Sequence, residues 1–144
     1  MEKHNAYDDN SDKQVEQLIE EYVKQFFTKA EKEVIRIKNN IWSIKEDRYI
    51  FNIIITSMLC IFDAVLLDKI PDEKNKLFEE LLRMNAHHVK SSKFCLVKNG
   101  IHLRIIRGLE DFDYSEFSDH VTEFRDLYPK IKDQLMKRYF PIET

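Results

Sequence analysis

Glycine, proline and cysteine are scarce in this chain of 144 residues, which contains two glycines, three prolines and two cysteines. Two glycines are too few for a glycine-rich loop that binds phosphate. The same scarcity argues against a flexible linker or a low-complexity segment. Cys60 and Cys95 both lie in apolar segments, so we expect them to be reduced core thiols, as is usual in the cytosol.

The chain also lacks a concentration of charge of one sign. Its net charge is -3, and its lysines and arginines are scattered along the sequence. Nucleic-acid binding requires a concentrated basic face, so we expect no nucleic-acid partner. Residues 1–10 are polar and contain no apolar signal segment. A cytoplasmic location is therefore expected.

No apolar run is long enough for a membrane span. The most apolar stretch is Tyr49–Leu67, and 14 uncharged residues lie between Arg48, just before it, and Asp63. A spanning helix needs about 18–20, so we expect no membrane insertion. Most residues of the stretch are β-branched or aromatic, which favours β-structure. It predicts two adjacent strands, at about 48–56 and 58–67, in the centre of a sheet.

Apolar residues that recur every three or four positions predict three helices. The first covers about 12–30, the second about 71–85 and the third about 114–138. We expect residues 1–11 to form a disordered polar tail and residues 12–144 to form a single domain.

Four residues mark where these helices begin, end or bend. Ser11 starts a capping-box pattern before the first helix, and Asn85 is a candidate stop for the second. Asp113 is a candidate N-cap for the third helix. Pro129 lies inside the third helix and predicts a kink or break near 126–128.

Asn39 and Asn40 predict the turn of a first hairpin, because asparagine tolerates the positive φ of a type I′ turn. A two-residue loop at this position pairs Ile37 with Trp42 and places both on one face.

Asn99 and Gly100 predict a second hairpin in the same way. The expected register sets Phe94 opposite Ile105. The complete order is then α-β-β-β-β-α-β-β-α, an α+β fold in which helices pack on an antiparallel sheet.

The sequence contains no set of residues typical of catalysis or metal binding. His87 and His88 are adjacent, so their side chains point in different directions and rarely bind one metal ion. No serine, cysteine or threonine has the context of an activated nucleophile. We therefore expect no catalytic residue, no metal and no cofactor. Asp63, within the apolar stretch, is open to three interpretations: a strand end that meets solvent, a paired buried charge, or an interface contact.

Three segments carry a resemblance to a known family. Phe78–Asn85 looks like a helix that ends in a leucine pair and an asparagine, and the 93–106 segment looks like the last hairpin of that family. Leu109–Phe117 is similar to its acidic and aromatic entry into the final helix. In these segments and in element order, the chain resembles the class I type III secretion chaperones and the related YbjN-like bacterial regulators.

The resemblance implies a small, cytoplasmic, non-enzymatic protein that binds another protein and is usually a homodimer. The chaperones tend to be more acidic than a chain with a net charge of -3, which keeps the YbjN-like branch open.

Our leading hypothesis is a dimeric protein-binding module, a chaperone or adaptor. Apolar residues are expected on both faces of the sheet, and an extended partner segment gains affinity from backbone hydrogen bonds and side-chain pockets. The predicted partner-binding residues are Ile50, Ile54, Phe62 and Leu66.

The alternative is a regulatory domain that senses a ligand. In this hypothesis a small molecule binds in a pocket between the sheet and the first helix, and His102 and Arg104 provide its polar contacts.

Overall fold

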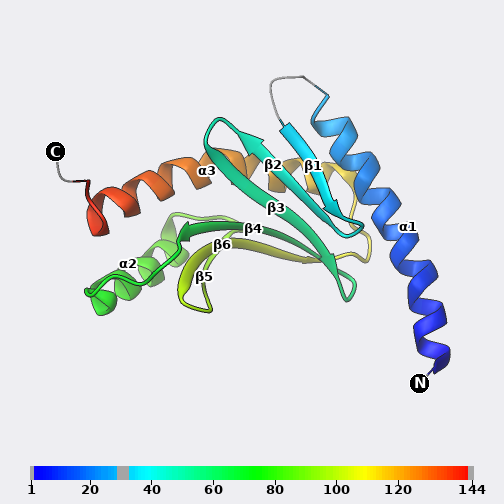
Figure 1. Cartoon of the computed structure of the whole chain (residues 1–144), viewed down its shortest axis with the longest axis horizontal. Coiled ribbons are helices and arrows are strands. Elements are labelled where there is room, and N and C mark those ends of the chain that lie inside the picture. The colour runs from blue at the N-terminus through cyan, green and yellow to red at the C-terminus, as the bar shows by residue number, and fades with distance from the viewer. Residues whose placement is uncertain (1, 29–32, 143–144) are drawn as a thin grey trace.

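The computed structural model describes residues 2–28 and 33–142 and shows an antiparallel sheet with helices packed on it (Figure 1). The order of elements is the predicted one, α-β-β-β-β-α-β-β-α. The strands are arranged in the order β1-β2-β3-β4-β6-β5. The elements are α1 Glu2–Phe26, β1 Glu33–Lys38, β2 Ile41–Glu46, β3 Tyr49–Thr56, β4 Leu59–Leu67, α2 Lys74–His87, β5 Lys93–Val97, β6 Gly100–Gly108 and α3 Tyr114–Tyr139.

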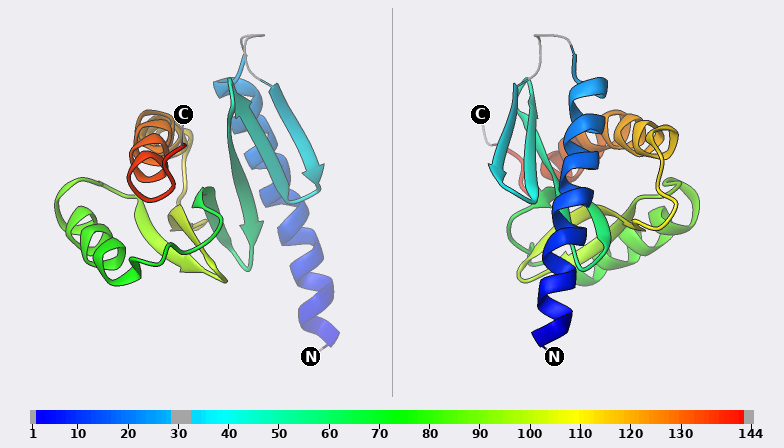
Figure 2. Two further views of the ribbon diagram at one scale, coloured as in Figure 1. Left: turned by 60° about the vertical axis from the view of Figure 1, so that its left-hand side comes forward. Right: turned by 90° about the vertical axis from the view of Figure 1, so that its right-hand side faces the viewer.

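The two faces of the sheet differ because helices cover only one of them. Alternate residues of each strand point to opposite faces, and α1 and α3 lie on the same side of β1 and β2 (Figure 2, right). We call this side the covered face and the other side the open face. The covered face carries the core: Trp42, Ile44, Phe51, Ile53, Ile55, Cys60, Phe62, Ala64, Leu66, Leu103 and Ile105.

Helix α1 begins about ten residues before its predicted start. It runs from Glu2 to Phe26, so a helix start at Ser11 is wrong. The segment 2–11 contains no glycine or proline to interrupt a helix. The N-terminal turns extend beyond the sheet (Figure 1). Contacts with the core come from Ile19 and Val23, which are buried. A domain boundary near residue 12 stays a prediction.

The other two helices differ from expectation at single residues. Asn85 lies inside α2, and its side chain accepts a hydrogen bond from the Phe94 amide at 2.8 Å. Helix α3 runs unbroken through Pro129, so the expected break is absent. The predicted N-cap is confirmed, because the Asp113 carboxylate accepts a hydrogen bond from the Glu116 amide at 2.8 Å.

The first hairpin has a different register from the predicted one. Trp42 pairs with Arg36 instead of Ile37, because the register shifts between Arg36 and Lys38. Neither Asn39 nor Asn40 has a positive φ, so the turn is not type I′. A bulge inserts one extra residue and changes which side chains share a face.

The second hairpin also turns one residue earlier than predicted. Val97 pairs with Gly100, so Lys98 and Asn99 form the loop, and Lys98 has a φ of 54°. Phe94 consequently pairs with Leu103 and not with Ile105. Moving the turn by one residue moves the pairing partner of each β5 residue by two. Each side chain therefore stays on its predicted face, since side chains alternate with a period of two.

Candidate protein-binding surface

The open face carries a row of isoleucines that crosses four neighbouring strands. Ile41 pairs with Ile54, Ile54 with Ile61, and Ile61 with Ile106. Ile106 is 56% exposed, and the other three are partly buried by their neighbours. We call these four residues the isoleucine row. Branched side chains that are adjacent across strands form a continuous apolar strip.

A polar row lies beside the isoleucine row, two residues further along each strand. It contains Ser43, Asn52, Asp63, Arg104 and Lys93, each the register partner of the next. The open face is therefore divided into bands that run across the strands.

A second apolar band lies on the far side of the polar row. Ile50 on β3 is 47% exposed and Val65 on β4 is 37% exposed. On β6 this band ends at His102, whose register partner on β5 is Cys95. At the other edge of the sheet, the β1 residues Ile35 and Ile37 are 52% and 56% exposed. The open face thus presents apolar side chains from the β1 edge to β6.

Asp63 is the buried anion of the polar row. It is 7% exposed, and its Oδ1 atom accepts a hydrogen bond from Arg104 Nε at 2.5 Å. His102 Nδ1 lies 2.9 Å from the same oxygen. Of the three interpretations left open by the sequence, the structure selects the paired buried charge. Both partners come from β6, the strand next to Asp63 in the sheet.

The structure places the four predicted partner-binding residues on two different faces of the sheet, and their role in binding stays a prediction. Ile50 and Ile54 lie on the open face, but Phe62 and Leu66 are fully buried on the covered face. The reason is register, because Ile54 pairs with Ile61, and a one-residue difference moves a side chain to the other face. Ile61 and Val65 occupy the open-face positions that the prediction gave to Phe62 and Leu66.

His102 and Arg104 cannot line a pocket between the sheet and α1. Both lie on the open face, where they contact Asp63, whereas α1 packs on the covered face. The structure thus brings the two residues together at Asp63, on the face opposite α1.

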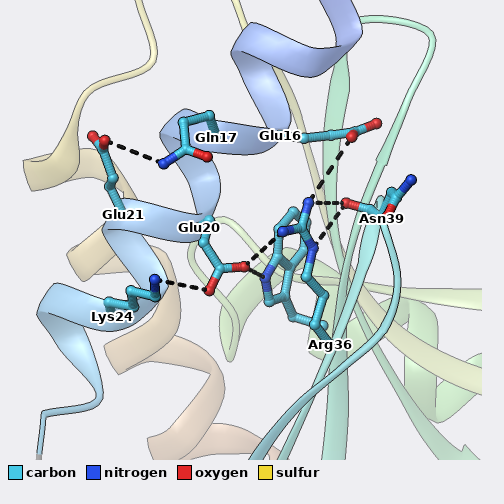
Figure 3. A network of polar contacts seen from close by, with 8 residues as sticks. Glu16, Gln17, Glu20, Glu21, Lys24, Arg36 and Asn39 are labelled. Carbon is cyan, nitrogen blue, oxygen red and sulfur yellow. Dashed lines mark hydrogen bonds and ion pairs between the residues drawn. The ribbon is translucent and has the colours of Figure 1, made fainter.

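Side chains occupy the interface between α1 and the first hairpin (Figure 3). Trp42 Nε1 donates to the Glu20 carboxylate of α1 at 2.8 Å, and Arg36 Nη1 lies 3.2 Å from the same carboxylate. The Arg36 guanidinium also lies over the Trp42 ring, 5.0 Å from its centroid, and donates to the Asn39 carbonyl. These contacts fix α1 to the β1–β2 edge of the sheet.

An apolar groove lies at the opposite edge, between α2 and β5. Its volume is about 280 Å³. Two leucines on its rim, Leu82 of α2 and Leu96 of β5, are 68% and 61% exposed. The groove is lined by Phe78, Leu81, Leu82, Asn85, Phe94, Cys95, Leu96 and Ile101.

The two thiols have raised pKa values. Burial raises the pKa of Cys60 to about 12. Burial also raises the pKa of Cys95, against a smaller lowering by Arg104. Neither thiol is therefore activated as a nucleophile, which requires a lowered pKa. Within residues 2–28 and 33–142, no group of three potential ligands is placed to hold a metal ion. No described helix combines the length and apolarity of a membrane span.

Sequence reasoning missed Ile61, Val65 and Ile106 as surface residues. Alternation along each strand indicated which residues share a face within that strand. The relation between neighbouring strands depends on turns and bulges, and these set the register of one strand against the next.

The fold is similar to solved structures of type III secretion proteins. One is the type III secretion chaperone SycH of Yersinia pestis in complex with a stable fragment of YscM2. The TM-score is 0.54 at 16% sequence identity, over 81% of this chain and 98% of that chain.

Another is a chain of the heterodimeric ExoU–SpcU complex from the type III secretion system of Pseudomonas aeruginosa. It has a TM-score of 0.53 at 11% identity, over 84% of this chain and 97% of that chain. The fold is thus the one seen in type III secretion chaperones. No protein-family model and no curated protein sequence matches the chain.

Proposed function

We propose that this protein is a non-enzymatic chaperone or adaptor that binds an extended segment of another protein. The observation that carries this proposal is the open face, where branched apolar side chains stay exposed on the side opposite α1 and α3. Exposed apolar patches of this kind mark interaction sites. The similar solved structures are complexes with partner proteins, which supports the same role here.

The chain works in the cytoplasm, as either a secretion chaperone or a YbjN-like regulator. The fold supports the first branch, and the mild net charge of -3 keeps the second as the alternative. No observation favours the ligand-sensing function, since His102 and Arg104 face away from α1.

The protein forms a homodimer through the groove between α2 and β5. Leu82 and Leu96 are the most exposed apolar residues beside this groove, and β5 is an edge strand with an unpaired side. An exposed edge next to an apolar groove is a site that proteins cover by pairing. A two-fold axis there places the same residues on both sides of the interface.

Affinity capture tests the client-binding role. Tagged wild type, Ile54→Glu and Met136→Glu are each incubated with native lysate from the source cells, and captured proteins are identified by mass spectrometry. Met136, on α3, is 40% exposed and serves as the control. We expect one client to be captured by wild type and by the control but not by Ile54→Glu. Capture that is identical with all three proteins would contradict the proposed surface.

Size-exclusion chromatography with light scattering tests the dimer. Wild type should have the mass of two chains, and Leu82→Glu or Leu96→Glu should have the mass of one, because a charge buried at the interface is costly. Ile142→Glu, at a residue that is 90% exposed, should remain dimeric. A wild-type protein that is monomeric at micromolar concentration would contradict the proposed dimer.

A further inference from the structure

The order of apolar and polar bands on the open face indicates which side chains a bound segment would need. Along β3 three successive open-face residues are Ile54, Asn52 and Ile50, and along β4 two of them are Ile61 and Asp63. Val65 follows Asp63 on β4. On the open face, the side chains of both strands therefore follow the order apolar, polar, apolar.

Strand geometry translates this pattern into a partner pattern. Two residues of extended chain span about 6.6–6.8 Å, in the sheet and in a partner segment that lies along its strands. A segment aligned with β4, on its β6 side, thus places side chains i and i+4 on the two apolar bands and its centre beside Arg104. Its side chain i+2 then faces the polar row.

The outward-facing charge of the polar row is positive. Asp63 is buried, whereas Lys93, the register partner of Arg104, is exposed. Arg104 binds Asp63 through Nε, and among the described residues no acceptor is bound to its Nη1 or Nη2 atoms. A guanidinium with both Nη groups available presents a planar fork that matches a carboxylate.

From this arrangement we infer that the occupant of the open face is an extended segment with an acidic residue between two apolar ones, in the pattern apolar-x-Asp/Glu-x-apolar. Arg104 and Lys93 bind its carboxylate, and the two apolar bands bind the flanking side chains. The inference rests on the proposed protein-binding function. A second copy of the chain is a poorer occupant, because it presents its own cationic row to Arg104 and Lys93 and like charges repel.

Fluorescence anisotropy with three labelled peptides tests this inference on the full chain. The peptides GSISESISG, GSISQSISG and GSISKSISG differ only in their central residue. We expect the glutamate peptide to bind about tenfold more tightly than the glutamine peptide, and the lysine peptide to bind most weakly. The preference for the glutamate peptide should disappear in Arg104→Gln and become smaller in Lys93→Gln. The Lys93 side chain is exposed and has no structural role in the sheet core. Arg83→Gln, an exposed α2 cation, is the matched control and should keep the preference.

Each other outcome overturns the inference. Equal affinity for the three peptides, or no binding up to about 1 mM protein, means that the open face does not select an acidic centre. A preference that survives in Arg104→Gln places the selection elsewhere. A change of oligomeric state in Ile54→Glu identifies a second copy as the occupant. None of these results decides the proposed function itself, which the capture experiment with Met136→Glu as control judges separately.

Discussion

At the scale of the residue, Asp63 shows how a charge can lie in the middle of a sheet. Its carboxylate is covered by neighbouring side chains and accepts from two groups of β6, Arg104 and His102. A buried ion pair does not stabilise a fold by much in total, but removing one partner leaves the other charge uncompensated. The cluster therefore fixes the β4–β6 pairing, since only one register brings these three residues together.

The first prediction concerns Asp63→Asn. Without the carboxylate, Arg104 and His102 lose their shared acceptor, and we expect the free energy of unfolding to fall by about 2 kcal/mol. Urea denaturation followed by circular dichroism measures the change. Asp133→Asn is the control, because Asp133 bonds Arg48 and Tyr49 at the surface, where ion pairs contribute little. Equal midpoints for the two variants would show that the buried cluster is not structural.

The second prediction concerns His120, whose ring contacts the edge or face of Phe62 and stacks on Phe112. Burial lowers the pKa of His120 from its ordinary value of 6.5, although the nearby Glu123 and other acidic groups oppose this. The folded protein thus favours the neutral ring. Stability should be fully present above pH 6.5 and be lost as the pH falls below it, because the unfolded chain then binds more protons.

Urea midpoints at pH 7.5, 6.5 and 5.5 measure this loss, and the decline should be smaller in His120→Gln. The range ends above 4.5, the ordinary pKa of Glu123, where that residue adds its own effect. Burial acts to raise the pKa of Glu123, but hydrogen bonds from Ser92 and Ser91 outweigh burial and lower it. An unchanged decline in His120→Gln would assign the pH dependence to other groups.

At the scale of the element, Gly100 is needed by a neighbouring strand and not by its own turn. Its φ is not positive, yet a Cβ atom at this position would lie 2.7 Å from the Leu67 carbonyl oxygen. The sequence indicated the hairpin through Asn99 and Gly100 but explained the glycine by the turn. The structure shows that a glycine is needed here because β4 and β6 approach each other closely.

The third prediction compares two glycines of β6. Gly100→Ala should lower stability by about 1–3 kcal/mol, because the backbone of β4 must move to admit a methyl group. Gly108→Ala is the matched control, since a Cβ atom added at Gly108 would meet nothing within 4 Å, and it should be neutral or slightly stabilising. Thermal unfolding of both variants provides the measurement. A Gly100→Ala variant as stable as wild type would contradict the close approach.

The order of elements could be read from the sequence, whereas the pairing between elements could not. Hydrophobic periods identified the helices and the central strands, because these elements bury one face, and turn residues identified the two hairpins. The bulge in β1 has no sequence mark, and it moved Arg36 opposite Trp42. The same limit explains why Phe62 was assigned to the surface. Its alternation within β4 was clear, but its face depended on how Ser57 and Met58 turn the chain.

At the scale of the whole molecule, α1 joins the domain through its second half. Ile19 and Val23 are buried, and Glu20 holds Trp42 at the sheet. The chain has a single tryptophan, which is fully buried. Its fluorescence therefore reports whether α1 is packed on the sheet.

The fourth prediction uses this reporter on two truncations. Deletion of residues 2–11 should leave the tryptophan emission unchanged and move Tm by less than about 3 °C, since it keeps the buried residues Ile19 and Val23 and the Glu20 contact with Trp42. Deletion of residues 2–24 removes Ile19, Glu20 and Val23, and should shift the emission to the red as Trp42 meets water. A red shift in the shorter deletion would place the domain boundary before residue 12.

The polar row also affects how the protein behaves before a partner arrives. Without Asp63 and Arg104, the isoleucine row and the Ile50–Val65 band would join into one continuous apolar surface. Sheets with such a surface tend to stack on one another and aggregate. The row interrupts this plane with a strip that must stay hydrated, so each remaining patch is smaller than a whole-face contact. The proposed binding face can thereby resist stacking with other copies of the chain while no partner covers it.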